Sequence, residues 1–345
     1  MTSDEFAACV HPREYARLIL ALLFAAPVTL LLLGVIYFTS GLALAAVLFV
    51  ALLVWFGFEI SYATLLGHWI LVSEYNYPRL KHLLDEVKRE IGVKTRIDMI
   101  VFEQGQFNTL LSTLFARRAI YIYSELLEQG VSDDELRWII GRFIGHIRAK
   151  RRLGALSWMI SAAEYLGVFN LFLYPYVRAT VYTGDRAGLA AINGNISTAV
   201  SAMNKLMVGR QLGYSVNPEG IVRQSRRVQG SFFGFLGRLA SPLPYTVARY
   251  VDLIRFSEHR FPNQYTEFAT LNPAFQMAGG TNKLLHSGET FSEEERKSIA
   301  GKVGWLLAGG LAASLVLSGV WVAMLGFPFA PKHAMGDIIV ENNTP

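Results

Sequence analysis

The sequence is short of charge and of cysteine. Asp, Glu, Lys and Arg together make up 17% of its 345 residues, and Cys9 is the single cysteine. A soluble domain usually carries about 25% charged residues, so this composition favours membrane segments beside a folded domain. One cysteine excludes an internal disulfide framework.

Several functional motifs are missing too. We find no repeat, phosphate-binding loop, dinucleotide fingerprint or Cys/His cluster. The formal net charge of +5 is modest and suits an anionic membrane surface at least as well as nucleic acid. No nucleic-acid motif accompanies the basic residues, so the expected partners are the lipid bilayer and a protein.

Long uncharged runs are present. Residues 18–38 contain no charge, and 42–58 form a second such run, whose apolar continuation to 72 is interrupted only by Glu59 and His68. Residues 303–329 form a third uncharged run. Each is long enough to cross about 30 Å of hydrocarbon as a helix. We therefore predict a short N-terminal segment (1–17), a tight transmembrane hairpin (18–72), a folded domain (73–300), a C-terminal transmembrane helix (303–329) and a tail (330–345).

Two points about the membrane follow from charge. Residues 155–177 are apolar but contain Glu164, which favours a buried helix pair and leaves a re-entrant membrane element open. All but four of the 32 Lys and Arg residues lie within 73–300. This predicts a cytoplasmic N-terminus and central domain, with a bacterial inner membrane as the location.

The central domain mixes helices with a small sheet. Helical spacing predicts a helix over 78–91, and residues 96–102 and 119–123 have strand patterns. Ser132 and Glu135 form a capping box, so we expect a helix from 133 to about 152. Residues 213–230 are polar and basic, which predicts a mobile loop. The expected fold is mainly α with a small sheet (α+β).

The capped helix carries the decisive motif, ELRWIIGRFIGHI (135–147). It resembles the active-site helix of membrane zinc metallopeptidases of the HtpX and CAAX prenyl endopeptidase type, where the pattern is DELxxVxxHELGHI. Four further stretches resemble that family in the same order: FNT (107–109), YIYSELL (121–127), RATVYTGDR (178–186) and SPLPYTVAR (241–249). The resemblance implies a zincin-like domain.

The resemblance also implies a degenerate metal site. It places Arg142 at the first His, Phe143 at the general-base Glu, His146 at the second His and Val181 at the third ligand. A catalytic zinc of this type needs two His four residues apart, a third ligand and a Glu that activates water. Arginine cannot ligate, and phenyl and isopropyl groups have no donor atom. We therefore expect no metal, no cofactor and no catalytic residue.

The resemblance gives a role to Asp185 as well. In the family, the Asp at this position supports the first His. Since that His is Arg142 here, we predict an Arg142–Asp185 ion pair, with the alternative that Arg142 faces solvent and Asp185 caps a helix. His146 is expected to be a hydrogen-bonded core residue.

Three functions stay open at this point. The favoured one is an inactive metallopeptidase-like scaffold or regulator that binds a protein or lipid partner, with an old substrate groove edged by the strand 119–123 and lined by Asn108, Tyr121 and Tyr123. The second is an active zinc endopeptidase with a rearranged site drawn from His146, Asp185, Glu164 or Glu103. The third is a structural subunit of a membrane complex.

Overall fold

The computed structural model describes residues 1–39, 41–103, 109–114, 117–127, 131–154, 156–157, 160–161, 164, 170–276 and 283–286. The chain divides into two compact units, Met1–His286 and Ser287–Pro345. All described residues belong to the first unit. The predicted C-terminal transmembrane helix (303–329) and tail (330–345) lie outside the described residues.

Two long apolar helices follow the N-terminal segment. Helix α2 covers Glu14–Phe38 and α3 covers Leu42–His68, and both are long and apolar enough to cross a membrane. The link contains Gly41, whose φ of +83° is a backbone conformation that favours glycine. The first two predicted spans are therefore helices near the predicted bounds.

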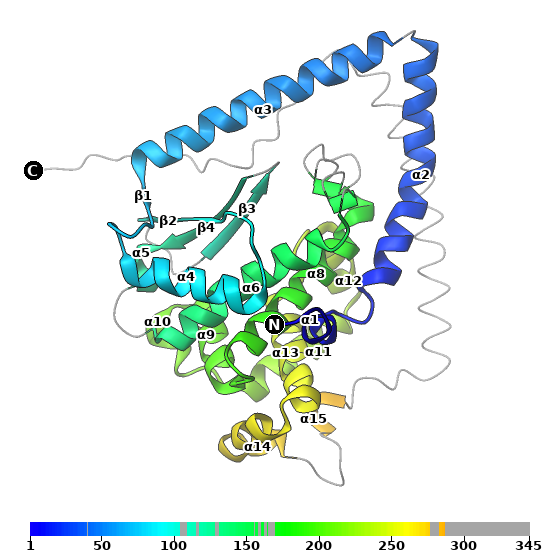
Figure 1. The fold of residues 1–345 in the computed structure, drawn as a ribbon. Coiled ribbons are helices and arrows are strands. Elements are labelled where there is room, and N and C mark those ends of the chain that lie inside the picture. Colours follow the sequence, from blue (N-terminus) through cyan, green and yellow to red (C-terminus); the bar gives the residue numbers. More distant parts are fainter. Residues whose placement is uncertain are drawn as a thin grey trace, which may run out of the picture. The chain divides into compact units, whose positions relative to one another are not determined.

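The two helices do not pack as a tight hairpin. Figure 1 shows them diverging from their link. The packed face of α2 is used against α8 (Asn170–Ala191) instead: Leu18 and Ala21 are buried there with Tyr176. The rings of Phe24 and Phe172 stack with centroids 6.0 Å apart. From the sequence we expected α2 to pack on α3 and did not consider α8 as an alternative packing partner.

A four-stranded sheet follows α3. Its strands are β1 (Ile70–Leu71), β2 (Asp98–Phe102), β3 (Thr109–Leu114) and β4 (Arg117–Tyr123). Their order is β1-β2-β4-β3, with β2 and β4 parallel and the other two pairs antiparallel. The prediction that β4 edges a groove is wrong, because β3 pairs along it and takes the edge itself.

The sheet separates two apolar environments, as strand alternation requires. Ile120 and Ile122 of β4 face the main core, whereas Ala119 packs with Ile100 and with Tyr62 of α3. The Tyr62 hydroxyl donates a hydrogen bond to Asp98 Oδ2 at 2.6 Å. The end of α3 is thus fixed to one face of the sheet.

Helices cover the other face of the sheet (Figure 1). Helix α4 (Pro78–Ile91) buries Leu80, Leu83 and Leu84, and α5 (Ser124–Leu127) leads to α6 (Asp133–Arg151). The capping box of α6 is present: Ser132 accepts from the Glu135 amide at 3.2 Å, and Glu135 accepts from the Ser132 amide at 2.8 Å. The predicted α4 and α6 are confirmed.

The remaining helices form the layer beyond α6. They are α9 (Ile196–Val208), α10 (Arg210–Gly213), α11 (Pro218–Gln229), α12 (Phe232–Ala240), α13 (Thr246–Arg260), α14 (Pro262–Leu271) and α15 (Lys283–His286), with a 3-10 turn at Pro273–Phe275. The mainly helical α+β class is therefore confirmed.

The predicted mobile loop over 213–230 is wrong, because most of it is α11. Asn217 caps this helix by accepting from the Glu219 amide, and Pro218 occupies the first turn. Arg223 donates to Glu219 one turn away, and Val222 is buried. The polar face masked an amphipathic helix.

The N-terminal segment is part of the folded unit. Helix α1 (Ser3–Cys9) has its own capping box and buries Phe6 and Cys9 in the main core. The guanidinium carbon of Arg148 lies 4.3 Å from the Phe6 ring centroid. The segment that the sequence marked only as an N-terminal extension therefore packs on α6 and α8.

Candidate functional site

The motif of residues 135–147 lies where α6 crosses α8 at very short range. A Cβ atom on Gly184 would lie 2.4 Å from the Arg142 carbonyl oxygen, and one on Gly145 would lie 2.6 Å from the Ala187 Cβ. Glycines spaced four apart on both helices allow this contact. The crossing sets positions 142 and 146 of α6 against α8, the helix that also carries position 181.

Arg142 occupies a largely apolar place. Its guanidinium carbon lies 4.6 Å from the Phe143 ring centroid and 5.5 Å from that of Trp138. The pKa of Arg142 is lowered to about 9, mainly by burial and in addition by the charge of Arg249, while Asp185 acts in the opposite direction. A cation flanked by aromatic rings thus stands at the position of the first ligand.

The predicted Arg142–Asp185 ion pair is wrong, because Asp185 pairs with Arg249 of α13. Arg249 Nε donates to Asp185 Oδ2 at 2.7 Å, and a terminal nitrogen donates to Oδ1 at 2.6 Å. The Asp185 side chain is only 2% exposed. A guanidinium that donates two parallel hydrogen bonds holds a carboxylate in fixed geometry. Asp185 therefore links α8 to α13.

A second bidentate pair joins the same two helices. Arg186 Nε donates to Asp252 Oδ2 at 2.9 Å, and a terminal nitrogen donates to Oδ1 at 2.7 Å. Burial raises the pKa of Asp252, while the hydrogen bonds from Arg186 lower it. Together the two pairs lock α8 to α13 with polar contacts that need no metal.

His146 is the surviving ligand position, and it is held neutral. Burial lowers its pKa to about 3, Lys150 adds to that effect, and a hydrogen bond with the Thr180 backbone opposes it. Its Nδ1 is buried and has no hydrogen-bond partner among the described residues. The expected core role agrees with its surroundings, although one ring nitrogen is left unsatisfied.

The residues at this crossing do not fit a catalytic zinc. Of the four positions that would hold and serve the metal, only His146 carries a donor. Glu164 is taken by Lys150, whose Nζ lies 2.8 Å from its carboxylate, and Asp185 is taken by Arg249. Among the described residues, no group of three His, Cys, Asp or Glu side chains is placed to hold a metal.

Acidification is expected to destabilise the fold through the two buried imidazoles. The pKa values of His146 and His11 are both lowered to about 3, mainly by burial. The unfolded chain takes up these protons near pH 6.5, so stability is full above pH 6.5 and falls below it. The slope should be roughly 1.4 kcal/mol per pH unit for each histidine.

Chemical denaturation between pH 7 and pH 5 measures this slope. His146→Asn should remove about half of it, leaving the part from His11. His82→Asn, at an exposed position of α4, is the control and should leave the slope unchanged. An unaltered slope in His146→Asn would show that this imidazole already titrates normally in the folded protein.

The predicted groove residues are only partly placed. Asn108 lies outside the described residues. Tyr123 is 4% exposed, and its ring lies 4.2 Å from that of Phe102, while Tyr121 meets Phe102 edge-on at 6.1 Å. Both tyrosines therefore belong to an aromatic cluster on the interior strand β4.

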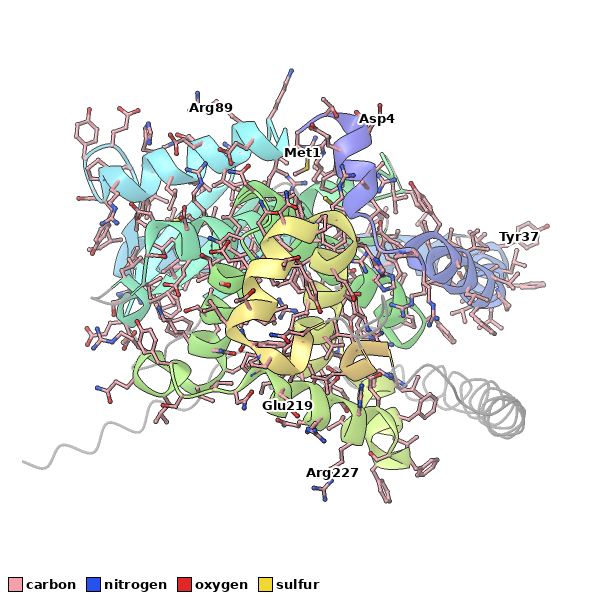
Figure 2. All side chains as sticks on the ribbon, turned by 90° about the horizontal axis from the view of Figure 1, so that it is seen from below. Met1, Asp4, Tyr37, Arg89, Glu219 and Arg227 are labelled. Carbon is pink, nitrogen blue, oxygen red and sulfur yellow. The ribbon has the colours of Figure 1, made fainter. Side chains whose placement is uncertain are left out.

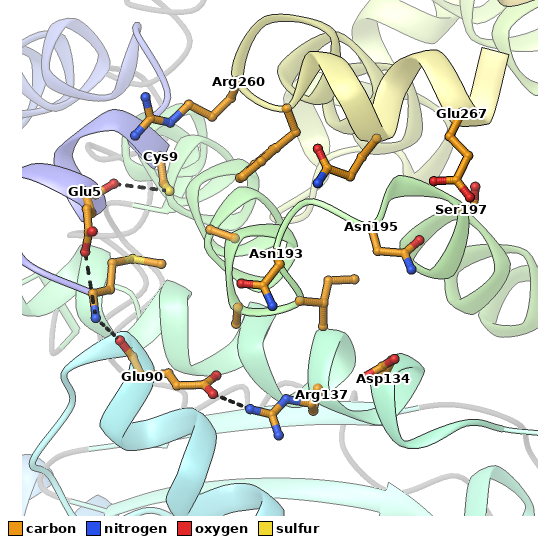
Figure 3. A pocket seen from close by; sticks show the side chains of 16 residues that line it. Glu5, Cys9, Glu90, Asp134, Arg137, Asn193, Asn195, Ser197, Arg260 and Glu267 are labelled. Carbon is orange, nitrogen blue, oxygen red and sulfur yellow. Dashed lines mark hydrogen bonds and ion pairs between the residues drawn. The ribbon is translucent and has the colours of Figure 1, made fainter. Parts of the chain in front are cut away.

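A polar cavity of about 880 Å³ lies elsewhere in the fold (Figure 3). Its lining comes from α1, α4, α6, the α8–α9 connection, α13 and α14, and includes Glu5, Arg137, Asn193 and Arg260. Neither Arg142, His146 nor Val181 contributes to it. The cavity is therefore separate from the degenerate motif.

Sequence reasoning missed several buried charges. Arg249 and Asp252 had no partner assigned, and Lys205 was not noticed; its Nζ lies 2.7 Å from Glu135 Oε1, with both side chains 5% exposed. Spacing within one helix cannot reveal such pairs, because their members lie more than 60 residues apart. The sequence offered one indication of these pairs: Asp185, Arg186 and Arg249 are charged residues within mostly apolar helical stretches.

One comparison with known proteins gives a match. The model of peptidase family M48 matches residues 74–257, more than half of the chain. Neither the curated proteins nor the solved structures contain a match. The matched region includes strands β2, β3 and β4, helices α6 and α8 and most of α13, so it covers Arg142, Phe143, His146 and Val181.

Proposed function

Since the chain belongs to peptidase family M48, we propose that it is a metallopeptidase-like protein that has lost catalysis and acts by binding a partner. The observation that carries this proposal is the replacement at three of four site positions by Arg142, Phe143 and Val181. No group at those positions can hold zinc or activate water. The bidentate pairs between α8 and α13 support it, because they stabilise the same helices without a metal.

The proposal includes the membrane setting. Helices α2 and α3 would anchor the protein in a bacterial inner membrane, with residues 303–329 as a further span and the central domain in the cytoplasm. The exposure of large apolar side chains along both helices supports anchoring, and the concentration of Lys and Arg in 73–300 supports the orientation. The close α6–α8 crossing is the feature that favours a zincin-like core.

An extended peptide is the partner that the sheet suits. The strand order places β3 at one edge, where its outward amide and carbonyl groups offer a template for strand addition. This moves the binding edge from β4, as the sequence suggested, to β3. Peptide binding at such an edge needs no metal.

Fluorescently labelled unfolded casein tests this function with the full chain in detergent. We expect casein to bind without being cleaved. Single proline substitutions at positions 110 to 113 should weaken binding where the amide points away from β4, since proline removes that donor. His146→Ala should leave binding unchanged. Casein cleavage that a chelator abolishes would instead show an active endopeptidase.

A further inference from the structure

Four arginines gather where α2 begins. Arg178 of α8 is buried and donates to the carbonyl oxygens of Arg238 and Ser241, both at 2.6 Å. Arg17 reaches toward the Pro175 carbonyl at 3.4 Å, and its guanidinium is within electrostatic range of Arg13 and Arg238. Three segments far apart in sequence thus place like charges together.

Within the part of the chain that the structure describes, no acidic side chain forms an ion pair with these four arginines, Arg13, Arg17, Arg178 and Arg238. Two carboxylates of the same region are engaged elsewhere: Glu14, next to Arg13 in the sequence, accepts from the Thr183 hydroxyl, and Asp252, which is within electrostatic range of Arg17, is held by Arg186. Burial, Arg17 and Arg238 together lower the pKa of Arg178 to about 10.

The cluster lies at the boundary of the apolar helix. Arg17 is the last charged residue before the uncharged run 18–38. Two turns further along α2, Phe24 stacks on Phe172, which precedes Arg178 by less than two turns on α8. Both helices therefore change from apolar to cationic at the same level, which is where lipid head groups lie when α2 crosses a bilayer.

The neighbouring helix α12 adds apolar surface. It packs on α8, the helix that carries Arg178, and it exposes Phe232 and Phe233 by 57% and 81%. Arg238 of the same helix belongs to the cluster, with its guanidinium carbon 5.6 Å from the Phe235 ring. Cationic and aromatic groups side by side are typical of a surface that rests on a membrane.

We propose that Arg13, Arg17, Arg178 and Arg238 bind the phosphate-bearing head group of an anionic phospholipid at the foot of α2. Basic pockets beside transmembrane helices on the cytoplasmic side take such head groups, and guanidinium groups match phosphate oxygens in geometry and charge. A bound phosphate would also offset the repulsion among the four cations. This site is independent of whether the protein cleaves or binds peptides.

Native mass spectrometry of the full chain in a neutral detergent tests the site. The protein is titrated with phosphatidylglycerol or phosphatidylcholine, and retained lipid is counted. We expect preferential retention of phosphatidylglycerol. Arg17→Gln with Arg238→Gln should weaken that binding about 30-fold, equivalent to about 2 kcal/mol for two arginines. Equal retention of both lipids by the unmodified protein would refute the site.

The matched control is Arg223→Gln with Arg227→Gln on α11, which removes the same charge. Both side chains are exposed, and Arg227 projects outward in Figure 2. This variant should bind phosphatidylglycerol normally, and an equal loss would show that only net charge matters. If the cluster variant does not fold, the exposed Arg13→Gln alone should weaken binding about fivefold. Displacement of the lipid by millimolar inorganic phosphate would mean that the site takes free phosphate and not lipid.

Discussion

Replacing Asp185 with alanine is expected to lower the free energy of unfolding by about 3–5 kcal/mol. The change leaves the Arg249 guanidinium buried without its bidentate partner, and burial of an uncompensated charge is costly. Thermal or chemical denaturation of the full chain in detergent measures the loss. From the sequence we also expected an ion pair for Asp185, but with Arg142 as its partner.

Two companion variants separate the pair from its surroundings. Asp185→Leu combined with Arg249→Met removes both charges and should recover much of the loss, because apolar replacements of buried pairs are often neutral. Glu219→Ala breaks an ion pair whose Arg223 side chain is 69% exposed, and should cost less than about 1 kcal/mol. Equal effects of Asp185→Ala and Glu219→Ala would contradict the assigned ion pair.

Restoring the ligand set should create a zinc site. Arg142→His, Phe143→Glu and Val181→Glu together supply the missing imidazole, base and third ligand beside His146. Because these groups would be poorly solvated, the metal-free variant should be less stable than the unmodified protein. Zinc should then bind at one ion per chain and raise the melting temperature, and a chelator should reverse the rise.

The control keeps one ligand missing. Adding His146→Ala to the restored variant should abolish zinc uptake, and the unmodified chain should not respond to zinc at all. Failure of the restored variant to take up zinc, while folded, would show that α6 and α8 no longer hold these positions in metal-binding geometry. In that case the difference from a zinc site would lie in the placement of α6 and α8 as well as in the replaced side chains.

Local features of the fold were predictable from the sequence. The capping box at Ser132 and Glu135, the α4 leucines and the strand 119–123 each depend on neighbours within a few residues, and each is present. The two N-terminal apolar helices were also predictable, because their length and lack of charge are sufficient.

Features that depend on distant partners were not predictable. The resemblance suggested Arg142 as the partner of Asp185, but Arg249 of α13 forms the bidentate pair with it. Strand β4 is interior because β3 pairs along its outer side, and the residue pattern of a single strand does not show which strand will pair with it. The polar stretch 213–230 hid a helix because only one face of α11 is buried.

Direct side-chain and backbone contacts join the helices around the motif. Zinc in such a site would connect α6 to α8, and here direct glycine contacts join those helices, while two bidentate pairs join α8 to α13. Arg142 and Phe143 pack on each other in place of the first ligand and the base. These contacts can hold the helices together without a bound metal.

Zinc content of the full chain, purified without chelators and then equilibrated with zinc, tests the central claim most directly. The account predicts no stoichiometric zinc by elemental analysis, in the unmodified protein and in His146→Ala alike. One zinc per chain that disappears in His146→Ala would contradict it and would place an active metal centre on α6.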